Sequence, residues 1–236
     1  MKKTIIVMPV ANEEDTMKQV IEEILALPYD NLFLYPVIDN YSKDRTEEII
    51  RSFEHMGRVK CIFYKESKGV ISCYLEGFRR ALKDGAEQII EMDGGGSHSP
   101  SEIPQFIDAL EKGYECVWGS RFVEGGDISN HPLYRRLLSS GGTILSNLVL
   151  GTKLKDMTSG FEAFTKDVLL GLKLNKFLST GHMYQTEMRF YCRDKKSIEV
   201  PIHYVGGSSS LKFKYVKESL EILFKLKKYE SNVKVK

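Results

Sequence analysis

The sequence predicts an α/β fold in which helices flank a mainly parallel sheet, and three observations support this. Strand-length apolar runs alternate with longer amphipathic stretches through the first half of the chain. Three of these runs end in an acidic residue or are closely followed by one. The length of 236 residues and the hydrophobic content of 42% suit one globular domain, or one domain with an appendage.

Each strand of the first half is predicted from an apolar run that ends at turn-forming residues. Strands are expected at residues 4–9, 32–39, 59–64, 86–93 and 114–118. The helices between them are predicted from apolar residues spaced three and four apart. They are expected at residues 14–27, after Ser42 as an N-terminal cap, at 69–83 and at 101–111. Strands joined by helices in this order indicate a mainly parallel sheet.

The regular alternation ends after Gly119. The later elements are expected to be a helix at 133–150, a strand at 159–164, a helix at 183–193, a strand at 198–204 and a helix at 213–228. Gly141 and Gly142 predict a break or bend in the first of these helices. We therefore expect a main domain over residues 1–207 and a basic amphipathic helix and tail over residues 208–236.

Charge and cysteine content argue against several classes of protein. The formal net charge of +2 is too small for a chain whose main partner is nucleic acid. The four cysteines include no C-x-x-C pair, so reduced thiols in a cytosolic protein are expected rather than zinc or disulfides. No stretch approaches the roughly 18 apolar residues of a membrane span, and the first apolar run is too short for a signal peptide. The chain is expected to be soluble, or at most to lie on a membrane surface.

Acidic residues follow three predicted strands at one edge of the sheet. Glu13 comes after the first strand, Asp39 ends the second and Asp93 ends the fourth. Open α/β sheets bind ligands at this edge, where Glu13 and Asp39 could bind a nucleobase or ribose and Asp93 a divalent ion beside phosphates. The alternative for each is a polar cap on a loop. Dinucleotide-binding and P-loop glycine patterns are absent.

Eight short motifs, in order from residue 9 to about residue 202, resemble those of one known family. They are PVANEE at 9–14, VIDNYSKDRT at 37–46, IEMDGGGSHSP at 90–100, GSRFVEGG at 119–126, RRLLS at 135–139, DMTSGF at 156–161, YQTEM at 184–188 and EVPI at 199–202. Together they are similar to the motifs of the family 2 glycosyltransferases. Within that family they resemble the polyprenyl-phosphate branch, which includes dolichyl-phosphate mannose synthase-like enzymes.

The resemblance implies a GT-A fold that binds a nucleotide-diphosphate sugar. It assigns nucleotide binding to Pro9, Asn12, Glu13, Asp39 and Lys68. It places Asp93 at the diphosphate, with a divalent cation, Mg²⁺ or Mn²⁺. The second carboxylate of the family's D-x-D motif is Gly95 in this chain, so fewer protein ligands are expected for that cation.

The resemblance also implies a polyprenyl or dolichyl phosphate as the acceptor. Arg121, Arg135 and Ser139 are expected to bind the lipid phosphate and, with Asp93, to form the catalytic group. Gln185, Glu187 and Lys212 are expected to make further substrate contacts. For Glu187, contact with the donor sugar and satisfaction of buried backbone groups are equally good expectations. His98 is expected to be structural, or to orient the loop behind the residues that bind a ligand, rather than to be a ligand itself, because no second ligand stands at metal-binding spacing.

Two alternatives to transfer onto a lipid stay open at this point. One is a transferase of the same fold that acts on a saccharide or glycan. The other is a non-catalytic protein that binds nucleotide sugars, which the missing second carboxylate favours. A lipid acceptor requires approach to a bilayer, so we expect a cytoplasmic protein attached peripherally to the cytoplasmic membrane face, directly or through a membrane-protein partner.

The basic C-terminal segment supports the same expectation. Apolar residues and lysines are interleaved from Lys212 to Lys228, as in helices that lie on anionic membranes. A helix packed on the protein with a solvated lysine face is the alternative.

Overall fold

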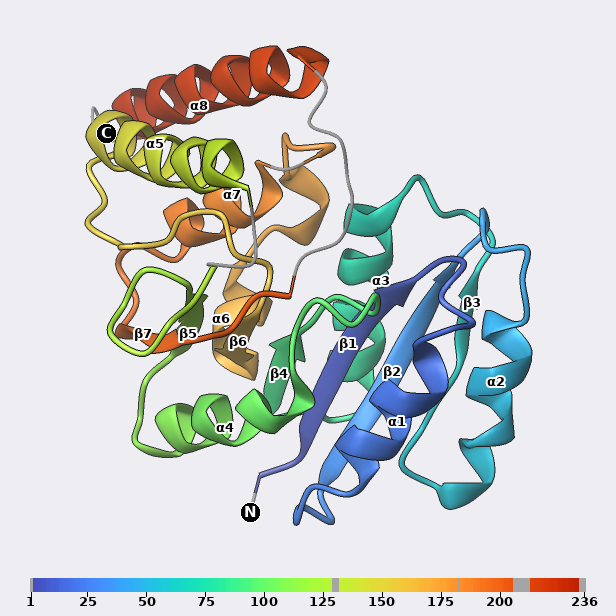
Figure 1. Ribbon diagram of the computed structural model, residues 1–236. Helices are drawn as coiled ribbons and strands as arrows, with labels where there is room; N and C mark the ends of the chain where they lie inside the picture. The colour runs from blue at the N-terminus through green and yellow to red at the C-terminus, as the bar shows by residue number, and fades with distance from the viewer. Residues whose placement is uncertain (1, 129–131, 182, 206–212, 234–236) are drawn as a thin grey trace.

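The computed structural model of the chain describes residues 2–128, 132–181, 183–205 and 213–233, apart from the side chains of residues 135, 175, 213–217 and 229–233. A seven-stranded sheet runs through the molecule in the order β3-β2-β1-β4-β6-β5-β7 (Figure 1). The strands are β1 (Thr4–Val10), β2 (Leu32–Asp39), β3 (Ile62–Tyr64), β4 (Gln88–Glu91), β5 (Cys116–Ser120), β6 (Glu162–Thr165) and β7 (Ser197–Pro201). β6 is antiparallel to both of its neighbours, and every other pairing is parallel.

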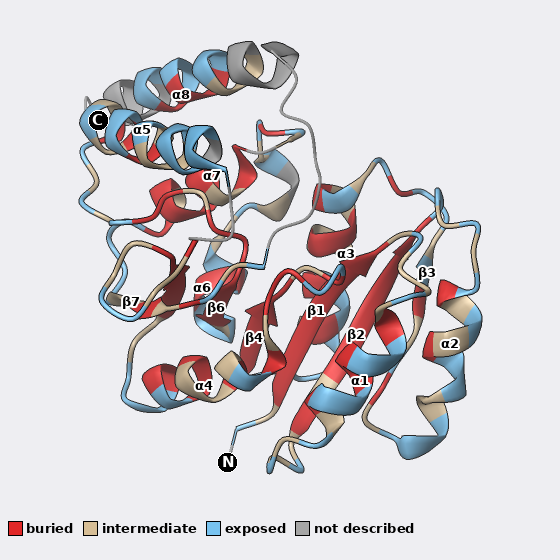
Figure 2. Cartoon of the chain, viewed as in Figure 1, coloured by how far each residue is buried: buried red, intermediate tan, exposed pale blue. Residues whose placement is uncertain are grey.

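Helices cover both faces of the sheet. They are α1 (Met17–Leu25), α2 (Thr46–Ser52), α3 (Val70–Lys83), α4 (Ile103–Glu111), α5 (Leu133–Leu150), α6 (Lys166–Gly171), α7 (Tyr184–Tyr191) and α8 (Phe213–Val233), with short 3₁₀ turns at Glu54–Met56, Pro100–Glu102 and Leu174–Lys176. Apolar side chains of α1, α2 and α4 pack on one face, and those of α3, α6 and α7 pack on the other. Strands covered on both sides must be apolar on both sides, which explains why every residue of β1 is buried (Figure 2).

A third, smaller core lies where α5, α7 and α8 meet. It is formed by Leu150, Met157, Met183, Phe190, Ile222, Leu223 and Leu226. α5 and α8 lie side by side at one end of the molecule (Figure 1). The buried side chains of α8 therefore face the protein, while its described lysines are exposed.

The strand order reverses at the centre of the sheet, which is where open α/β folds have their ligand crevice. The chain builds outward from β1 through β2 to β3, and then returns so that β4 pairs with the other side of β1. The loops that leave the carboxyl ends of β1 and β4 lie close together here, with Gly94 against Val10 and Gly95 beside Glu13. Open α/β sheets usually bind their ligands at this point. Asp93, two residues beyond the end of β4, lies at this point.

The predicted fold class is confirmed, and three local predictions are wrong. Ser42 does not cap α2, because its hydroxyl accepts the amide of Asn12 while Asp44 accepts the amide of Thr46. α5 continues through Gly141 and Gly142 without a break. The strand predicted from residue 159 begins only at Glu162, and α6 was not foreseen. The expected domain boundary at residues 207–208 lies outside the described residues.

Candidate active site

Asp93 is the centre of the candidate site. Its Oδ1 accepts a hydrogen bond of 2.5 Å from the hydroxyl of Tyr74 on α3, and its side chain remains 37% exposed. Burial, followed by the negative charges of Asp93 and Glu91, raises the pKa of Tyr74, so the phenol stays protonated and donates. One oxygen of Asp93 is thus fixed by the protein, and the carboxylate still faces solvent.

His98 lies beside Asp93 in an apolar pocket. Its Nε2 is 3.6 Å from Oδ2 of Asp93, and its ring packs against Phe161 and Tyr204. Neither ring nitrogen has a hydrogen-bond partner among the described residues, although both are buried. Burial is the main reason that the pKa of His98 falls to about 4, so the ring is neutral at physiological pH.

The glycine loop after Asp93 brings Glu13 close to the same centre. An ideal Cβ at Gly95 would lie 3.0 Å from Oε1 of Glu13, so that carboxylate lies over the position of the absent second aspartate. Burial raises the pKa of Glu13, and the charges of Asp44 and Asp93 add to the effect. At Gly94 a Cβ would lie 2.4 Å from Val10 Cγ1, which explains why that position needs glycine.

Asn12 joins the loops that follow β1 and β2. It adopts a left-handed backbone with φ of 58°, and its amide donates to Ser42 Oγ at 3.1 Å. Its side-chain Oδ1 accepts the amide of Lys43 at 2.9 Å, and the amide of Glu13 donates to Thr46 Oγ1 at 2.8 Å. The polar side chain of Asn12 is therefore used to shape the loop that presents Glu13.

The other residues expected at the nucleotide lie along the edge formed by β1, β2 and the start of α3. Pro9 is buried near the end of β1, and Asp39 ends β2 with its Oδ1 accepting the amide of Tyr41 at 3.1 Å. Lys68 is exposed just before α3, where its amide donates to Ser72 Oγ at 2.7 Å. The structure places these groups on one side of the crevice.

Gly160 brings Gln185 and Asp93 together from distant parts of the chain. A Cβ at Gly160 would lie 3.2 Å from Nε2 of Gln185 and 3.5 Å from Oδ2 of Asp93. Both side chains approach the position that a Cβ at residue 160 would occupy, so this arrangement depends on the absence of a side chain there.

Glu187 is buried on α7, two residues after Gln185. Its carboxylate accepts the amides of Leu178 and Ser179, both at 2.8 Å, and the hydroxyl of Tyr191 at 2.9 Å. This geometry fits the second of the two expected roles, the satisfaction of buried backbone groups, and holds the segment before α7 in place.

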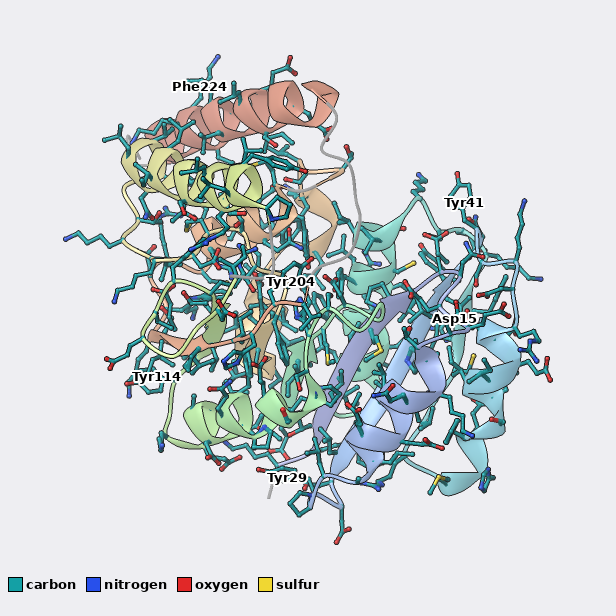
Figure 3. The ribbon with its side chains drawn as sticks, in the orientation of Figure 1. Asp15, Tyr29, Tyr41, Tyr114, Tyr204 and Phe224 are labelled. Carbon is teal, nitrogen blue, oxygen red and sulfur yellow. The ribbon has the colours of Figure 1, made fainter. Side chains whose placement is uncertain are left out.

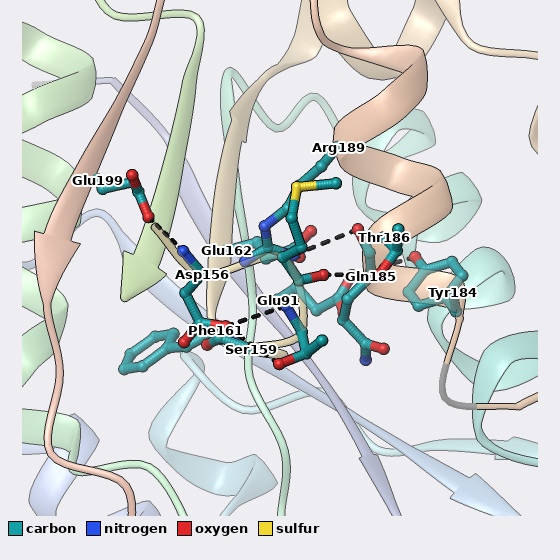
Figure 4. Close-up of polar contacts among 12 residues, drawn as sticks. Glu91, Asp156, Ser159, Phe161, Glu162, Tyr184, Gln185, Thr186, Arg189 and Glu199 are labelled. Carbon is teal, nitrogen blue, oxygen red and sulfur yellow. Dashed lines mark hydrogen bonds and ion pairs between the residues drawn. The ribbon is translucent and has the colours of Figure 1, made fainter. Parts of the chain in front are cut away.

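Arg121 forms a buried ion pair with Asp156. Its Nε lies 2.7 Å from Oδ2 of Asp156 and its Nη2 lies 2.8 Å from Oδ1, while Nη2 also donates to Thr158 Oγ1 at 2.5 Å. Burial alone would raise the pKa of Asp156, but the hydrogen bonds and charge of Arg121 outweigh burial and lower it. Glu199 in turn accepts the amide of Asp156 at 2.8 Å (Figure 4).

The remaining predicted residues are only partly described. Ser139 lies half-buried in the first half of α5, one turn before Gly142, which is close to Thr158. Arg135 lies on the same helix, but its side chain is outside the described residues, as is all of Lys212. Of the predicted acceptor residues, only Arg121 and Ser139 can be placed by their side chains.

Sequence reasoning missed a buried polar network beneath Asp93. Glu91 of β4 and Glu162 of β6 stand opposite each other in the sheet, and Arg189 of α7 contacts Glu162 (Figure 4). The hydroxyl of Tyr184 donates to Glu91 Oε2 at 3.1 Å, and its ring stacks on Tyr74. Acidic residues inside two apolar strands were the available signal, but their pairing depends on the direction of β6.

Burial determines the protonation of this network. It raises the pKa of Glu91 well above the ordinary range, and the nearby charges of Glu162 and Asp93 act in the same direction. Burial also raises the pKa of Glu162 to about 7, against the opposing charge of Arg189. Glu91 is therefore a neutral acid at physiological pH, which allows two carboxyl groups to face each other beside one guanidinium.

Relatives of known name match nearly the whole chain. A dolichol-phosphate mannosyltransferase of Pyrococcus furiosus is 30% identical over 98% of this chain, which spans 65% of that relative's length. A polyprenol monophosphomannose synthase of Mycolicibacterium smegmatis is 27% identical over 93% of this chain and 84% of its own. An undecaprenyl-phosphate mannosyltransferase of Micrococcus luteus is 29% identical over 86% of this chain and 84% of its own.

Solved structures agree on the fold at low sequence identity. A glucosyl-3-phosphoglycerate synthase of Mycobacterium tuberculosis, crystallised with Mn²⁺, UDP and phosphoglyceric acid, superposes with a TM-score of 0.70. It is 15% identical and covers 96% of this chain and 78% of its own. The profile of glycosyl transferase family 2 matches residues 5–171, from β1 through α6. The chain therefore belongs to glycosyl transferase family 2.

Proposed function

We propose that the protein transfers a sugar from a nucleotide-diphosphate sugar to a polyprenyl phosphate. The observation that carries this proposal is the half-open carboxylate of Asp93 at the central crevice of a family 2 fold, with Glu13, His98 and Gln185 around it. The lipid acceptor is supported by the three named relatives, each of which is a transferase or synthase for a prenyl-type phosphate.

In this proposal the donor lies across the ends of β1, β2 and β4. Glu13 and Asp39 accept hydrogen bonds from the nucleoside, beside Pro9 and the loop shaped by Asn12. Lys68 is exposed on the same side and adds positive charge toward the phosphates. The diphosphate then reaches Asp93, and Gln185, which also borders Gly160, contacts the sugar.

A divalent cation is part of the proposal, and the residues at Asp93 fit one that is shared with the diphosphate. The described residues contain no group of three His, Cys, Asp or Glu side chains placed to hold a metal. Asp93 and the buried, unpartnered imidazole of His98 are donors at the crevice. When bound, Mg²⁺ or Mn²⁺ would neutralise charge on the departing diphosphate.

The acceptor end of the site is assigned to Arg121, Arg135 and Ser139. A polyprenyl phosphate is an anion that can attack the anomeric carbon directly, so the protein has to position it and needs no strong general base. The bidentate contact with Asp156 uses Nε and Nη2 of Arg121 and fixes the plane of the guanidinium. In this proposal Nη1 receives a phosphate oxygen.

The exposed face of α5 supports attachment to a bilayer. It carries Leu133, Tyr134, Leu137, Leu138, Ile144, Leu145 and Leu148 in exposed or nearly exposed positions. Phe224 is exposed at the outer surface of the adjacent α8 (Figure 3). Lys225, Lys227 and Lys228 of the same helix are also exposed. Apolar side chains flanked by lysines suit an anionic membrane surface, where the lipid acceptor resides. No helix in the described part of the chain is long and apolar enough to cross a membrane.

The experiment that tests the proposed function is a transfer assay with labelled donors. UDP- and GDP-linked sugars are each incubated with the protein, Mn²⁺ and either a polyprenyl phosphate in detergent or a saccharide acceptor, and donor binding is measured in parallel. We expect label from one donor to move into the organic phase, in a product that mild acid cleaves. Transfer only to a saccharide would favour the glycan transferase, and binding without any transfer would favour the non-catalytic alternative.

A further inference from the structure

The imidazole of His98 is a buried polar group beside Asp93. Both of its nitrogens are buried, and neither has a hydrogen-bond partner among the described residues. Its Nε2 is 3.6 Å from Asp93 Oδ2, which is too long for a hydrogen bond. A buried donor or acceptor without a partner costs about 1–3 kcal/mol. Such a group at a ligand-binding crevice indicates that something binding there completes its contacts.

We propose that His98 Nε2 is a protein ligand of the cation that Asp93 binds together with the donor diphosphate. The inference rests on the proposed function, because it assumes a nucleotide-diphosphate donor. The site then offers one carboxylate oxygen and one imidazole nitrogen, and the diphosphate supplies further oxygens.

The distance between the two donors fits a shared ion. Bonds of about 2.1 Å to a cation separate two ligands by about 3.0 Å at a right angle and by about 4.2 Å when they are opposite. The separation of 3.6 Å between Nε2 and Oδ2 lies between these limits. The separation therefore suits one shared ion, which requires the buried Nε2 to open toward Asp93.

The loop itself argues against an aspartate-type ligand at position 95. A side chain there would begin 3.0 Å from Glu13 Oε1, so a carboxylate at 95 would stand against the carboxylate of Glu13. Like charges at this distance repel. The chain has a glycine at this position, so a second protein ligand for the cation would come from another residue. His98 is already within reach of Asp93.

A nitrogen ligand changes which metal the site prefers. Mg²⁺ favours oxygen ligands, whereas imidazole suits the transition metals, and carboxylate and phosphate oxygens suit Mn²⁺. We therefore expect Mn²⁺ to bind the nucleotide complex more tightly than Mg²⁺. With only two protein donors, we expect weak binding of either metal without nucleotide.

The test measures coordination directly, independently of turnover. Mn²⁺ is titrated into the full chain with UDP or GDP by electron paramagnetic resonance, and pulsed spectra then report nitrogen bound to the metal. Protein carrying ¹⁵N-histidine is compared with unlabelled protein, which identifies the nitrogen as imidazole. We expect a histidine nitrogen in the wild type, with no such signal and at least about tenfold weaker Mn²⁺ binding in His98→Ala.

His55→Ala is the matched control, because His55 is exposed in the 3₁₀ turn after α2 and its substitution should leave the spectrum unchanged. Mn²⁺ bound with nucleotide but without a histidine signal would overturn the inference and leave the proposed function intact. Nucleotide binding that excludes Mn²⁺ would also overturn it. If neither UDP nor GDP binds, with or without Mn²⁺, the proposed function itself fails. The wild-type spectrum decides the question even if His98→Ala does not fold.

Discussion

The ion pair between Arg121 and Asp156 gives the sharpest prediction about stability. Asp156 is fully buried, and Arg121 is nearly so. The carboxylate also accepts the amide of Arg121 at 3.1 Å and the amide of Thr158 at 3.0 Å. The substitution Asp156→Ala removes all of these acceptors and leaves a buried guanidinium without its counter-charge.

Breaking a buried pair in this way costs about 3–5 kcal/mol. That is a large fraction of the roughly 5–15 kcal/mol that stabilises a typical domain. At about 2–4 °C per kcal/mol for a chain of this size, the melting temperature should fall by about 6–20 °C. Asp156→Asn keeps the shape but loses the charge, so we expect a smaller loss of stability.

Urea unfolding followed by tryptophan fluorescence is a suitable assay. Trp118 is the single tryptophan of the chain and is buried in β5, so its emission reports the loss of the core. Glu47→Ala is the control, because the Glu47–Arg51 pair on α2 is largely exposed and should contribute only about 0.3–0.5 kcal/mol. A loss below about 1 kcal/mol for Asp156→Ala would refute the reasoning.

The same pair predicts a pH dependence. Because the pKa of Asp156 is lower in the folded protein, its stabilisation is complete above the unfolded value of about 3.9. It is lost as the pH falls through the lower folded value. The stability difference between wild type and Asp156→Ala should therefore be constant near neutrality and shrink in acid. A difference that persists unchanged at pH 2 would contradict this.

Three further predictions concern other parts of the chain. Gly94→Ala should destabilise by about 1–3 kcal/mol, since its Cβ would meet Val10, and an unchanged urea midpoint would contradict that packing. Glu91→Gln should change the unfolding free energy at pH 7 by less than about 0.5 kcal/mol, because glutamine resembles the neutral acid that accepts the hydrogen bond from Tyr184. A loss of stability above about 2 kcal/mol would mean that Glu91 is ionised in the wild type. Leu148 is 80% exposed, so Leu148→Glu should weaken binding to phosphatidylglycerol vesicles about tenfold or more without changing the melting temperature. If the variant sedimented with the vesicles as well as the wild type, that result would contradict the membrane face.

The general fold could be predicted because its signals are local. β2 runs over the predicted residues, and β1 differs from its prediction by one, since each apolar run is bounded by turn residues. The position of Asp93 followed from the same logic, because a parallel sheet gathers its strand ends at one edge. The antiparallel direction of β6 could not be predicted from the sequence, because a strand of only four residues gives no indication of its direction relative to its neighbours.

The contacts within the site depended on tertiary structure that local patterns do not encode. Arg121 and Asp156 were each noticed in separate motifs, yet their pairing joins the loop after β5 to the segment before β6. His98 was expected to be structural because no second ligand stands near it in sequence. The structure brings its ring against Asp93, and the unpartnered nitrogens are visible only in the folded chain. Likewise, Tyr74 lies on the buried side of α3 and was predicted only as a core residue, so its hydrogen bond to Asp93 could not be foreseen.

The measurement that tests the central claim most directly is sugar transfer by Asp93→Asn, compared with Asp15→Asn. Asp15 is an exposed aspartate on the loop before α1, and its substitution should leave transfer unchanged (Figure 3). Asp93→Asn should retain the fold, since asparagine can still accept the hydrogen bond from Tyr74. Asp15→Asn should retain it because Asp15 is exposed. We expect Asp93→Asn to lose at least about a hundredfold in turnover, the scale of a lost electrostatic group at a reacting centre. Wild-type turnover by a folded Asp93→Asn protein would contradict the placement of the active centre at Asp93.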